Sequence, residues 1–281
     1  MQDEIRLLDG RARLIFGSKF EHNDISDEDL EIEPSVRLSV AVAENQTLWA
    51  SVSHAVRMPS RGEQGGRVTT SILPPGQPEM PLPVPTVVLV AGNPQMMSEN
   101  VTAIEAGYRI RNRGFQLDAA VFFNSFSDLR SLSLGVPTCE PSGVISQVDP
   151  TCLFTSTHVT QPLVIGNDDT YDTMGVELWM SRQISERWRL RGGYTYFRKT
   201  GTTSGTQLEL GLVEDSPDHQ LFLRSSTDIN DSLEFDATLR WVDELESQQI
   251  DAYSALDLRL AWSPMPSLSI AAVARNLLAG D

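Results

Sequence analysis

Apolar and polar residues alternate with a period of two along most of the chain. Over residues 36–42, Val, Leu, Val and Val alternate with Arg, Ser and Ala. Over residues 233–241, Leu, Phe, Ala, Leu and Trp alternate with Glu, Asp, Thr and Arg. Because successive side chains of a strand point to opposite faces, this pattern predicts strands that each have one apolar and one polar face.

The same template predicts twelve strands, several of them about ten residues long or longer, which is the length that a tilted strand needs to cross a bilayer. They cover residues 2–8, 12–21, 34–43, 47–56, 101–111, 115–128, 173–183, 188–198, 219–228, 233–244, 253–263 and 267–276.

The predicted connections alternate between short turns and long segments. Turns such as 9–11 and 112–114 are rich in Asp, Asn and Gly, whereas 58–100 and 130–172 hold 43 residues each. Segments of that length are uncommon inside a compact domain. The pattern predicts an all-β fold: a portion of an antiparallel up-and-down transmembrane β-barrel, with short periplasmic turns and long extracellular loops. We therefore expect 58–99, 130–171 and 199–217 to emerge at one end, opposite 9–11, 112–114 and 228–232.

A soluble β-sandwich is the alternative interpretation, in which the apolar face is a core and not a lipid surface. Strands this long, with charged residues well inside their span, favour the barrel. Both interpretations remain open at this point.

Composition excludes several other classes. The 281 residues suit one large or two ordinary domains. The net charge of -16 and the absence of a Lys/Arg-rich run argue against a nucleic-acid partner. No window approaches 18 consecutive apolar residues, so a helical membrane protein is excluded. Two cysteines exclude both a multi-disulfide scaffold and a four-cysteine zinc site.

No catalytic constellation is found in the sequence. The four histidines, at positions 22, 54, 158 and 219, lie far apart and form no HExxH motif. The glycines form no dinucleotide or phosphate loop. We therefore expect no enzymatic activity, no metal site and no cofactor.

Charged residues recur on the polar face of the predicted strands. In a barrel this face lines the lumen, and we expect ion pairs between neighbouring strands in preference to direct ligand contacts. The predicted lumen residues are Glu105, Arg109, Arg111, Asp118, Glu177, Arg189, Arg191, Asp236, Arg240, Asp257 and Arg259, with Arg224 beside them.

Several short segments resemble one family in their order and spacing. They are Gln2–Ile5, Leu48–Arg61, Gly92–Pro94 followed by Glu105–Arg109, Asp218–Gln220, Leu256–Arg259 and Arg275–Leu277. Together they resemble the C-terminal part of the barrel of TonB-dependent outer-membrane receptors, which import iron chelates, cobalamin and related large nutrients.

The resemblance implies that residues 1–281 are the C-terminal portion of a barrel of roughly 22 strands that surrounds a plug. The plug, its TonB-contacting box, the signal peptide and the final strand are expected to be absent from this chain. A fragment with two unpaired edges is not expected to fold alone in lipid.

For function, the resemblance implies TonB-energised uptake of a scarce nutrient, most commonly a ferric siderophore, across the outer membrane of a Gram-negative cell. The implied partners are the TonB complex (acting through the plug), the nutrient and outer-membrane lipid. Cobalamin, haem or an oligosaccharide are the alternative cargoes. A passive porin or a surface β-protein is the alternative from a different functional class.

Two features of the long segments carry further expectations. Arg61, Glu63 and Arg67 are the candidate ligand-binding residues, because loops vary and bind while the barrel positions them. Cys139 and Cys152 are thirteen positions apart in a segment placed outside the cell, so we expect a disulfide between them. The spacing alone leaves a pair of free thiols as the alternative.

Overall fold

The computed structural model describes residues 1–281 except 23–29, 77–81, 142, 145–151, 203–215 and 279–281, and except the side chains of 143, 144, 152 and 202. Within the described ranges there are sixteen strands. They are β1 Gln2–Leu7, β2 Ala12–Glu21, β3 Glu31–Ala43, β4 Gln46–Arg57, β5 Arg67–Leu73, β6 Thr86–Ala91, β7 Glu99–Asn112, β8 Phe115–Leu134, β9 Thr138–Glu140, β10 Gly143–Val144, β11 His158–Ser185, β12 Trp188–Thr202, β13 His219–Asn230, β14 Leu233–Val242, β15 Tyr253–Met265 and β16 Leu268–Ala274.

Helical structure is short in the described part of the chain. It comprises α1 Arg61–Gly65, α2 Cys152–Thr155 and the 3-10 turn η1 Glu246–Gln248. None of these helices is long and apolar enough to cross a membrane.

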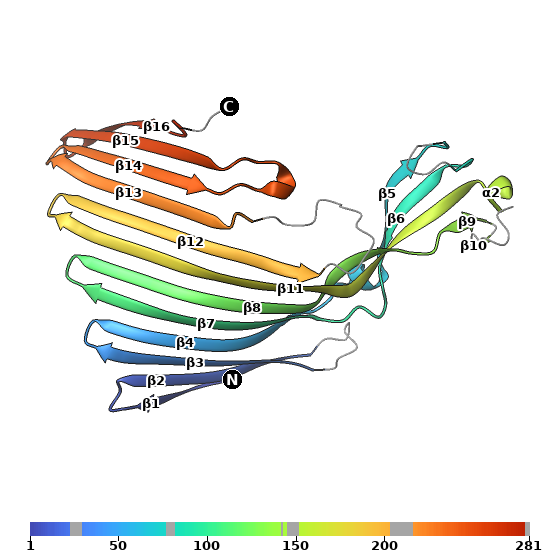
Figure 1. The fold of residues 1–281 in the computed structure, drawn as a ribbon, viewed down its shortest axis with the longest axis horizontal. Helices are drawn as coiled ribbons and strands as arrows, with labels where there is room; N and C mark the ends of the chain where they lie inside the picture. The colour runs from blue at the N-terminus through green and yellow to red at the C-terminus, as the bar shows by residue number, and fades with distance from the viewer. Residues whose placement is uncertain (23–29, 77–81, 142, 145–151, 203–215, 279–281) are drawn as a thin grey trace.

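Twelve strands form one continuous wall in chain order, β1-β2-β3-β4-β7-β8-β11-β12-β13-β14-β15-β16, and every neighbouring pair along it is antiparallel. Figure 1 shows the short turns together at one end of the wall and the long connections leaving from the other. We call these the turn end and the outer end. The predicted meander and its twelve wall strands are confirmed, and the described parts of 58–99 and 130–171 leave the wall at the same end, as predicted. Most of 199–217 lies outside the described residues.

The turns are tight because their residues adopt left-handed backbone angles. Asp9 and Gly10 have φ of 55° and 85°, and Gly114 has φ of 78°. Glycine adopts such angles without steric cost, and Asp tolerates them better than most residues. These turns fix the register of the hairpins that they close.

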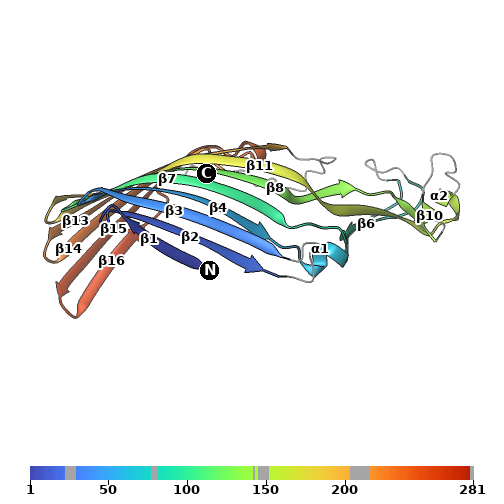
Figure 2. The ribbon, with the colours of Figure 1, turned by 90° about the horizontal axis from the view of Figure 1, so that it is seen from below.

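The wall is a curved sheet (Figure 2). Its two faces carry different side chains. One row of apolar side chains runs in register across six strands, and each of its members is exposed. The row consists of Phe16, Val36, Val52, Ile104, Phe123 and Met174. We call this side the apolar face and the opposite side the charged face. The wall itself encloses little core, which is the expected result when both faces of a sheet meet an external medium.

Two of the long segments contain secondary structure that the alternation did not predict. The segment after β4 contains α1, β5 and β6, and the segment after β8 contains β9, β10, α2 and the first half of β11. β8 and β11 extend beyond the wall into a projection at the outer end (Figures 1 and 2). There β6 and β9 pair with β11, β5 pairs with β6, and β10 pairs with β9.

Candidate functional site

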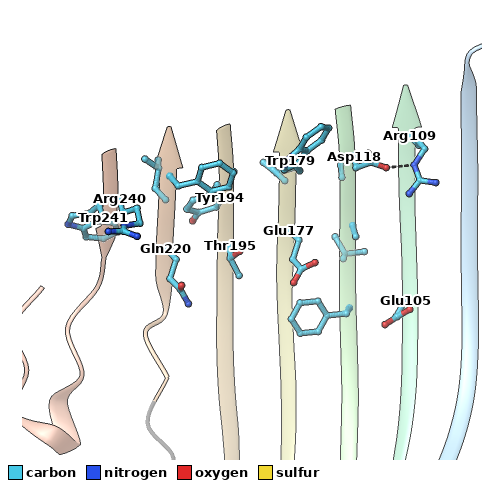
Figure 3. Close-up of a pocket in the computed structure, with 18 of the residues that line it drawn as sticks. Glu105, Arg109, Asp118, Glu177, Trp179, Tyr194, Thr195, Gln220, Arg240 and Trp241 are labelled. Atoms are coloured by element: carbon cyan, nitrogen blue, oxygen red, sulfur yellow. Dashed lines mark hydrogen bonds and ion pairs between the residues drawn. The ribbon is translucent and has the colours of Figure 1, made fainter. Parts of the chain in front are cut away.

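The charged face contains a hollow of about 680 Å³ near the middle of the wall. It is lined by residues of β4, β7, β8 and β11 to β14, which lie side by side in Figure 3. Glu105, Asp118, Glu177 and Arg240 are among the side chains around it. Each comes from a different strand, so the hollow exists only once the strands have paired.

All of the predicted lumen residues lie on this face. In the cross-strand register, Arg109 lies opposite Asp118 and Arg111 lies opposite Gln116, and Arg240 lies opposite Ala255. Residues that pair directly across two strands point to the same face of a sheet. Followed from strand to strand, the pairing puts the remaining predicted residues on that face as well: Glu105, Glu177, Arg189, Arg191, Arg224, Asp236, Asp257 and Arg259. The structure therefore puts these residues on one face.

Ion pairs connect several of them across neighbouring strands. Arg109 pairs with Asp118 directly opposite. Arg240 Nη2 lies 3.0 Å from Asp257 Oδ2. Such pairs each contribute roughly 0.2–1 kcal/mol in a sheet. They tie β7 to β8 and β14 to β15.

Asp236 accepts three side-chain hydrogen bonds on the charged face. Arg259 Nη1 donates to it at 2.9 Å, Arg224 Nη2 at 3.3 Å and Ser226 Oγ at 2.6 Å. Arg259 also donates to Glu234 at 3.0 Å. One carboxylate thus joins β13, β14 and β15.

Other predicted residues have no such partner. Arg189 Nε donates to Gln183 at 2.8 Å, and Glu105 accepts from Ser51 Oγ at 3.1 Å. Within the described part of the chain, Arg111, Arg191 and Glu177 form no ion pair. Their charges are therefore available to groups that contact the charged face.

Aromatic residues of the charged face were missed by the sequence analysis. Trp49, Phe122, Trp179 and Phe222 all line the hollow. Phe122 also lies 6.3 Å from Phe197, measured between ring centroids. The signal was available, because the alternation puts these residues in phase with the charged positions. The hollow is consequently both charged and aromatic.

Glu63 is held at the outer end by two guanidinium groups. Its Oε1 accepts from Arg57 Nη2 at 3.0 Å and from Arg130 Nη1 at 3.5 Å. Arg57 also donates to Glu99 at 2.7 Å, and the backbone N–H of Arg130 donates to Glu99 at 2.9 Å. The cluster joins the ends of β4, β7 and β8 to α1.

Glu63 also begins α1 through a capping box. Ser60 Oγ accepts from the Glu63 N–H at 3.2 Å, and Glu63 Oε2 accepts from the Ser60 N–H at 2.8 Å. Burial by itself raises the pKa of Glu63, but the hydrogen bonds from Arg57 and Ser60 outweigh it and lower the pKa to about 2. Glu63 is therefore ionised and structurally engaged.

The other two candidate ligand-binding residues are in a different situation. Arg61 at the start of α1 and Arg67 at the start of β5 are exposed, and neither forms an ion pair among the described residues. The three candidates therefore divide into one buried anchor, Glu63, and two free cations at the outer end.

Cys139 lies fully buried in β9. No free cysteine occurs in the part of the chain that the structure describes. The side chain of Cys152 lies outside the described residues. The predicted disulfide between the two stays a prediction.

The histidines have ordinary polar neighbours. His54 lies 3.3 Å from Thr102 Oγ1, His158 lies 3.0 Å from Thr157 Oγ1, and His219 lies 2.9 Å from the Tyr194 hydroxyl. Across the described ranges, no group of three or more His, Cys, Asp and Glu residues is placed to hold a metal ion.

Comparison with known proteins gives a match over nearly the whole chain. Residues 1–277 match the family model described as TonB dependent receptor-like, beta-barrel. A search of curated protein sequences finds no significant match.

Three solved structures illustrate the likeness in fold. A variant of the ferric enterobactin receptor PfeA from Pseudomonas aeruginosa, in complex with enterobactin, is 18% identical, with a TM-score of 0.72 over 98% of this chain and 39% of that one. The siderophore receptor PirA from Pseudomonas aeruginosa is 16% identical, with a TM-score of 0.67 over 98% and 44%. The copper transporter OprC is 14% identical, with a TM-score of 0.59 over 96% and 40%. The chain thus spans about two fifths of the length of these proteins.

Proposed function

This chain belongs to the TonB-dependent receptor-like β-barrel family, and we propose that it forms part of the wall of an outer-membrane receptor that takes up a ferric siderophore. The observation that supports this best is the difference between the two faces of one meander. The apolar face exposes a continuous row of large apolar side chains, as a lipid-facing surface does. The charged face carries ion pairs and a hollow, as the wall of a hydrated lumen does.

We further propose that residues 1–281 belong to the C-terminal portion of a larger barrel. β1 and β16 each pair on one side only in the described wall. A strand edge exposed to lipid leaves backbone groups without partners, at a cost of several kcal/mol each. Further strands of a longer protein would pair with both edges and close the barrel around a plug, through which TonB would act.

The proposed cargo rests on the family and on the neighbours in fold. PfeA and PirA are named as a ferric enterobactin receptor and a siderophore receptor. Identities of 16–18% show the fold alone, so the cargo requires a direct test.

That test is uptake by whole cells. The complete receptor is expressed in a Gram-negative host that lacks its own siderophore receptors, and uptake of radioactive iron from ferric enterobactin is measured with TonB intact and with TonB disabled. We expect uptake only with TonB intact. Equal uptake in both hosts would indicate a passive pore. Uptake of cobalamin or haem but not of ferric enterobactin would refute the proposed cargo and still support a role as an uptake receptor.

A further inference from the structure

The two long outer segments share a sheet. β6, from the segment after β4, runs parallel to β11, and residues 86–91 pair in unbroken register with residues 159–164. It is a parallel pairing beside a wall in which every pair is antiparallel. On the other side of the same stretch of β11 lie β9 and the end of β8. β11 therefore stands in the middle of a small sheet to which both segments contribute.

This small sheet also has a core of its own. Eight apolar residues are buried in the described part of the chain, and five of them lie in the outer segments. The five are Met96, Cys139, Val159, Leu163 and Ile165. Val159 is 1% exposed, and its partner in β6, Thr86, is 2% exposed. Most of the buried apolar side chains thus lie beyond the wall.

Side-chain hydrogen bonds fasten both segments to the rim of the wall and to each other. Asn167 of β11 donates from Nδ2 to the Met97 carbonyl at 3.1 Å and to the Asp128 carbonyl at 2.6 Å, and its Oδ1 accepts from the Met97 N–H at 2.8 Å. On the other side of β7, Ser98 Oγ donates to the buried Glu31 at 2.5 Å. Residues 93–98 are therefore held between β3 and β11.

We propose that β5, β6, β9, the outer half of β11 and residues 93–98 form a single preordered recognition module, which presents its binding surface as one rigid body. The role in recognition rests on the proposed function, whereas the rigidity does not. Loops that must be ordered by a ligand lose binding free energy, and a module with its own core avoids that loss. A substitution in one segment changes how the other is presented.

Hydrogen exchange on the complete receptor, without ligand, tests the coupling. Val159→Asp places a carboxylate in the shared core from the second segment. We expect amide exchange to accelerate on the order of tenfold or more in β5 and β6, which belong to the first segment, because a cooperative unit opens as a whole. Exchange in the wall over residues 101–111 should not change. The matched control is Val136→Asp, the same change at a site of the second segment that is 65% exposed. Acceleration confined to residues 158–166 would overturn the proposal.

A milder variant serves if Val159→Asp does not assemble in the membrane. Asn167→Ala removes the three hydrogen bonds to Met97 and Asp128 without placing a charge in the core. We expect faster exchange at residues 96–99, and Asn124→Ala, on the charged face, is the control. Unchanged exchange at residues 96–99 would also count against a single module.

A further exchange measurement, with ligand added, tests this proposal separately from the proposed function. Ferric enterobactin is added to the wild-type receptor, and binding is measured alongside exchange. With a preordered module, binding should change exchange in β6 by less than about twofold, because those amides are already protected. Strong new protection of β6 on binding would overturn the module and support the cargo. Coupled exchange in a receptor that does not bind ferric enterobactin would support the module and refute that cargo.

Discussion

The indole of Trp49 on β4 lies over Gly107 on β7, in the space that a side chain at Gly107 would occupy. The two residues are direct partners across the strands. A Cβ at Gly107 would lie 2.5 Å from Cε2 and Nε1 of the indole, which is well inside contact distance. The indole of Trp49 therefore fits on the charged face because its partner on the next strand, Gly107, has no side chain.

Gly107→Ala should accordingly destabilise the barrel by about 1–3 kcal/mol, as overpacking typically does. Unfolding of the complete receptor in lipid vesicles, monitored by tryptophan fluorescence, measures the change. Gly192→Ala is the control, because a Cβ there meets its nearest atoms at 3.6 Å and beyond. Equal effects of the two variants would show that the indole does not require the glycine.

The two faces of β15 should respond differently to charge. Leu258→Arg places a cation on the apolar face and should cost about 2–4 kcal/mol near the bilayer midplane. Arg259→Gln on the charged face should be milder, because Asp236 retains Arg224 and Ser226 as partners. The comparison uses unfolding free energies in the same vesicles. The reverse order would mean that the faces are inverted, since a shift of one residue exchanges them.

Asp236 should contribute more than its neighbour on the same strand. Asp236→Asn weakens hydrogen bonds from Arg224, Arg259 and Ser226, and we expect a loss of about 1–3 kcal/mol. Glu234→Gln is the matched control: the side chain of Glu234 is 55% exposed and has one ion pair, so its loss should be about 0–1 kcal/mol. A double substitution with Arg259 would show whether the two carboxylates act independently.

The anchor at the outer end should weaken in acid. The pKa of Glu63 is about 2 in the folded protein, against an ordinary value of 4.5. A lowered folded-state pKa gives stability that is complete above about pH 4.5 and is lost as the pH falls toward 2. Glu63→Gln should therefore reduce amide protection over residues 60–66 at pH 7 and have a much smaller effect at pH 2.

Exchange measured over that pH range, on the wild-type and variant receptors, checks this expectation. Glu44→Gln is the control, because Glu44 is an exposed carboxylate near the turn end. A Glu63→Gln effect that persists unchanged to pH 2 would show that its charge is not what holds α1.

Cys139 and Cys152 should form a disulfide when the receptor is made in an oxidising compartment. Closing a loop of roughly 15 residues restricts the unfolded chain by about 3 kcal/mol in the entropic treatment. Peptide mapping of receptor taken from outer membranes without reductant should find the peptides that contain Cys139 and Cys152 joined before reduction and separate after it. Both cysteines found as free thiols before reduction would refute the bridge.

The wall could be predicted from the sequence because its signals are local. Alternation within residues 233–241 defines the two faces of β14 without reference to any other strand, and Asp9-Gly10 marks its turn within three residues. Strictly alternating short and long connections then determine an antiparallel meander. The shared face of Asp118 and Arg240 follows from the same alternation.

The outer module could not be predicted in this way. β6 is a short apolar run, Thr86–Ala91, with no alternation to show its faces, and its partner in β11 lies more than seventy positions away. The Arg130 partner of Glu63 is 67 positions distant, and Met97 and Asn167 are 70 apart. No window of sequence contains both members of these pairs.

The sequence by itself determined the two-faced strands, their order and the end from which the long segments leave. Only the tertiary structure decided that Trp49 fits over Gly107, that Glu63 is a buried anchor, and that the long segments share one sheet and core. The physical reason is that the direction of a side chain on a strand depends on its own backbone, whereas packing and parallel pairing depend on which distant segments meet once the chain has closed.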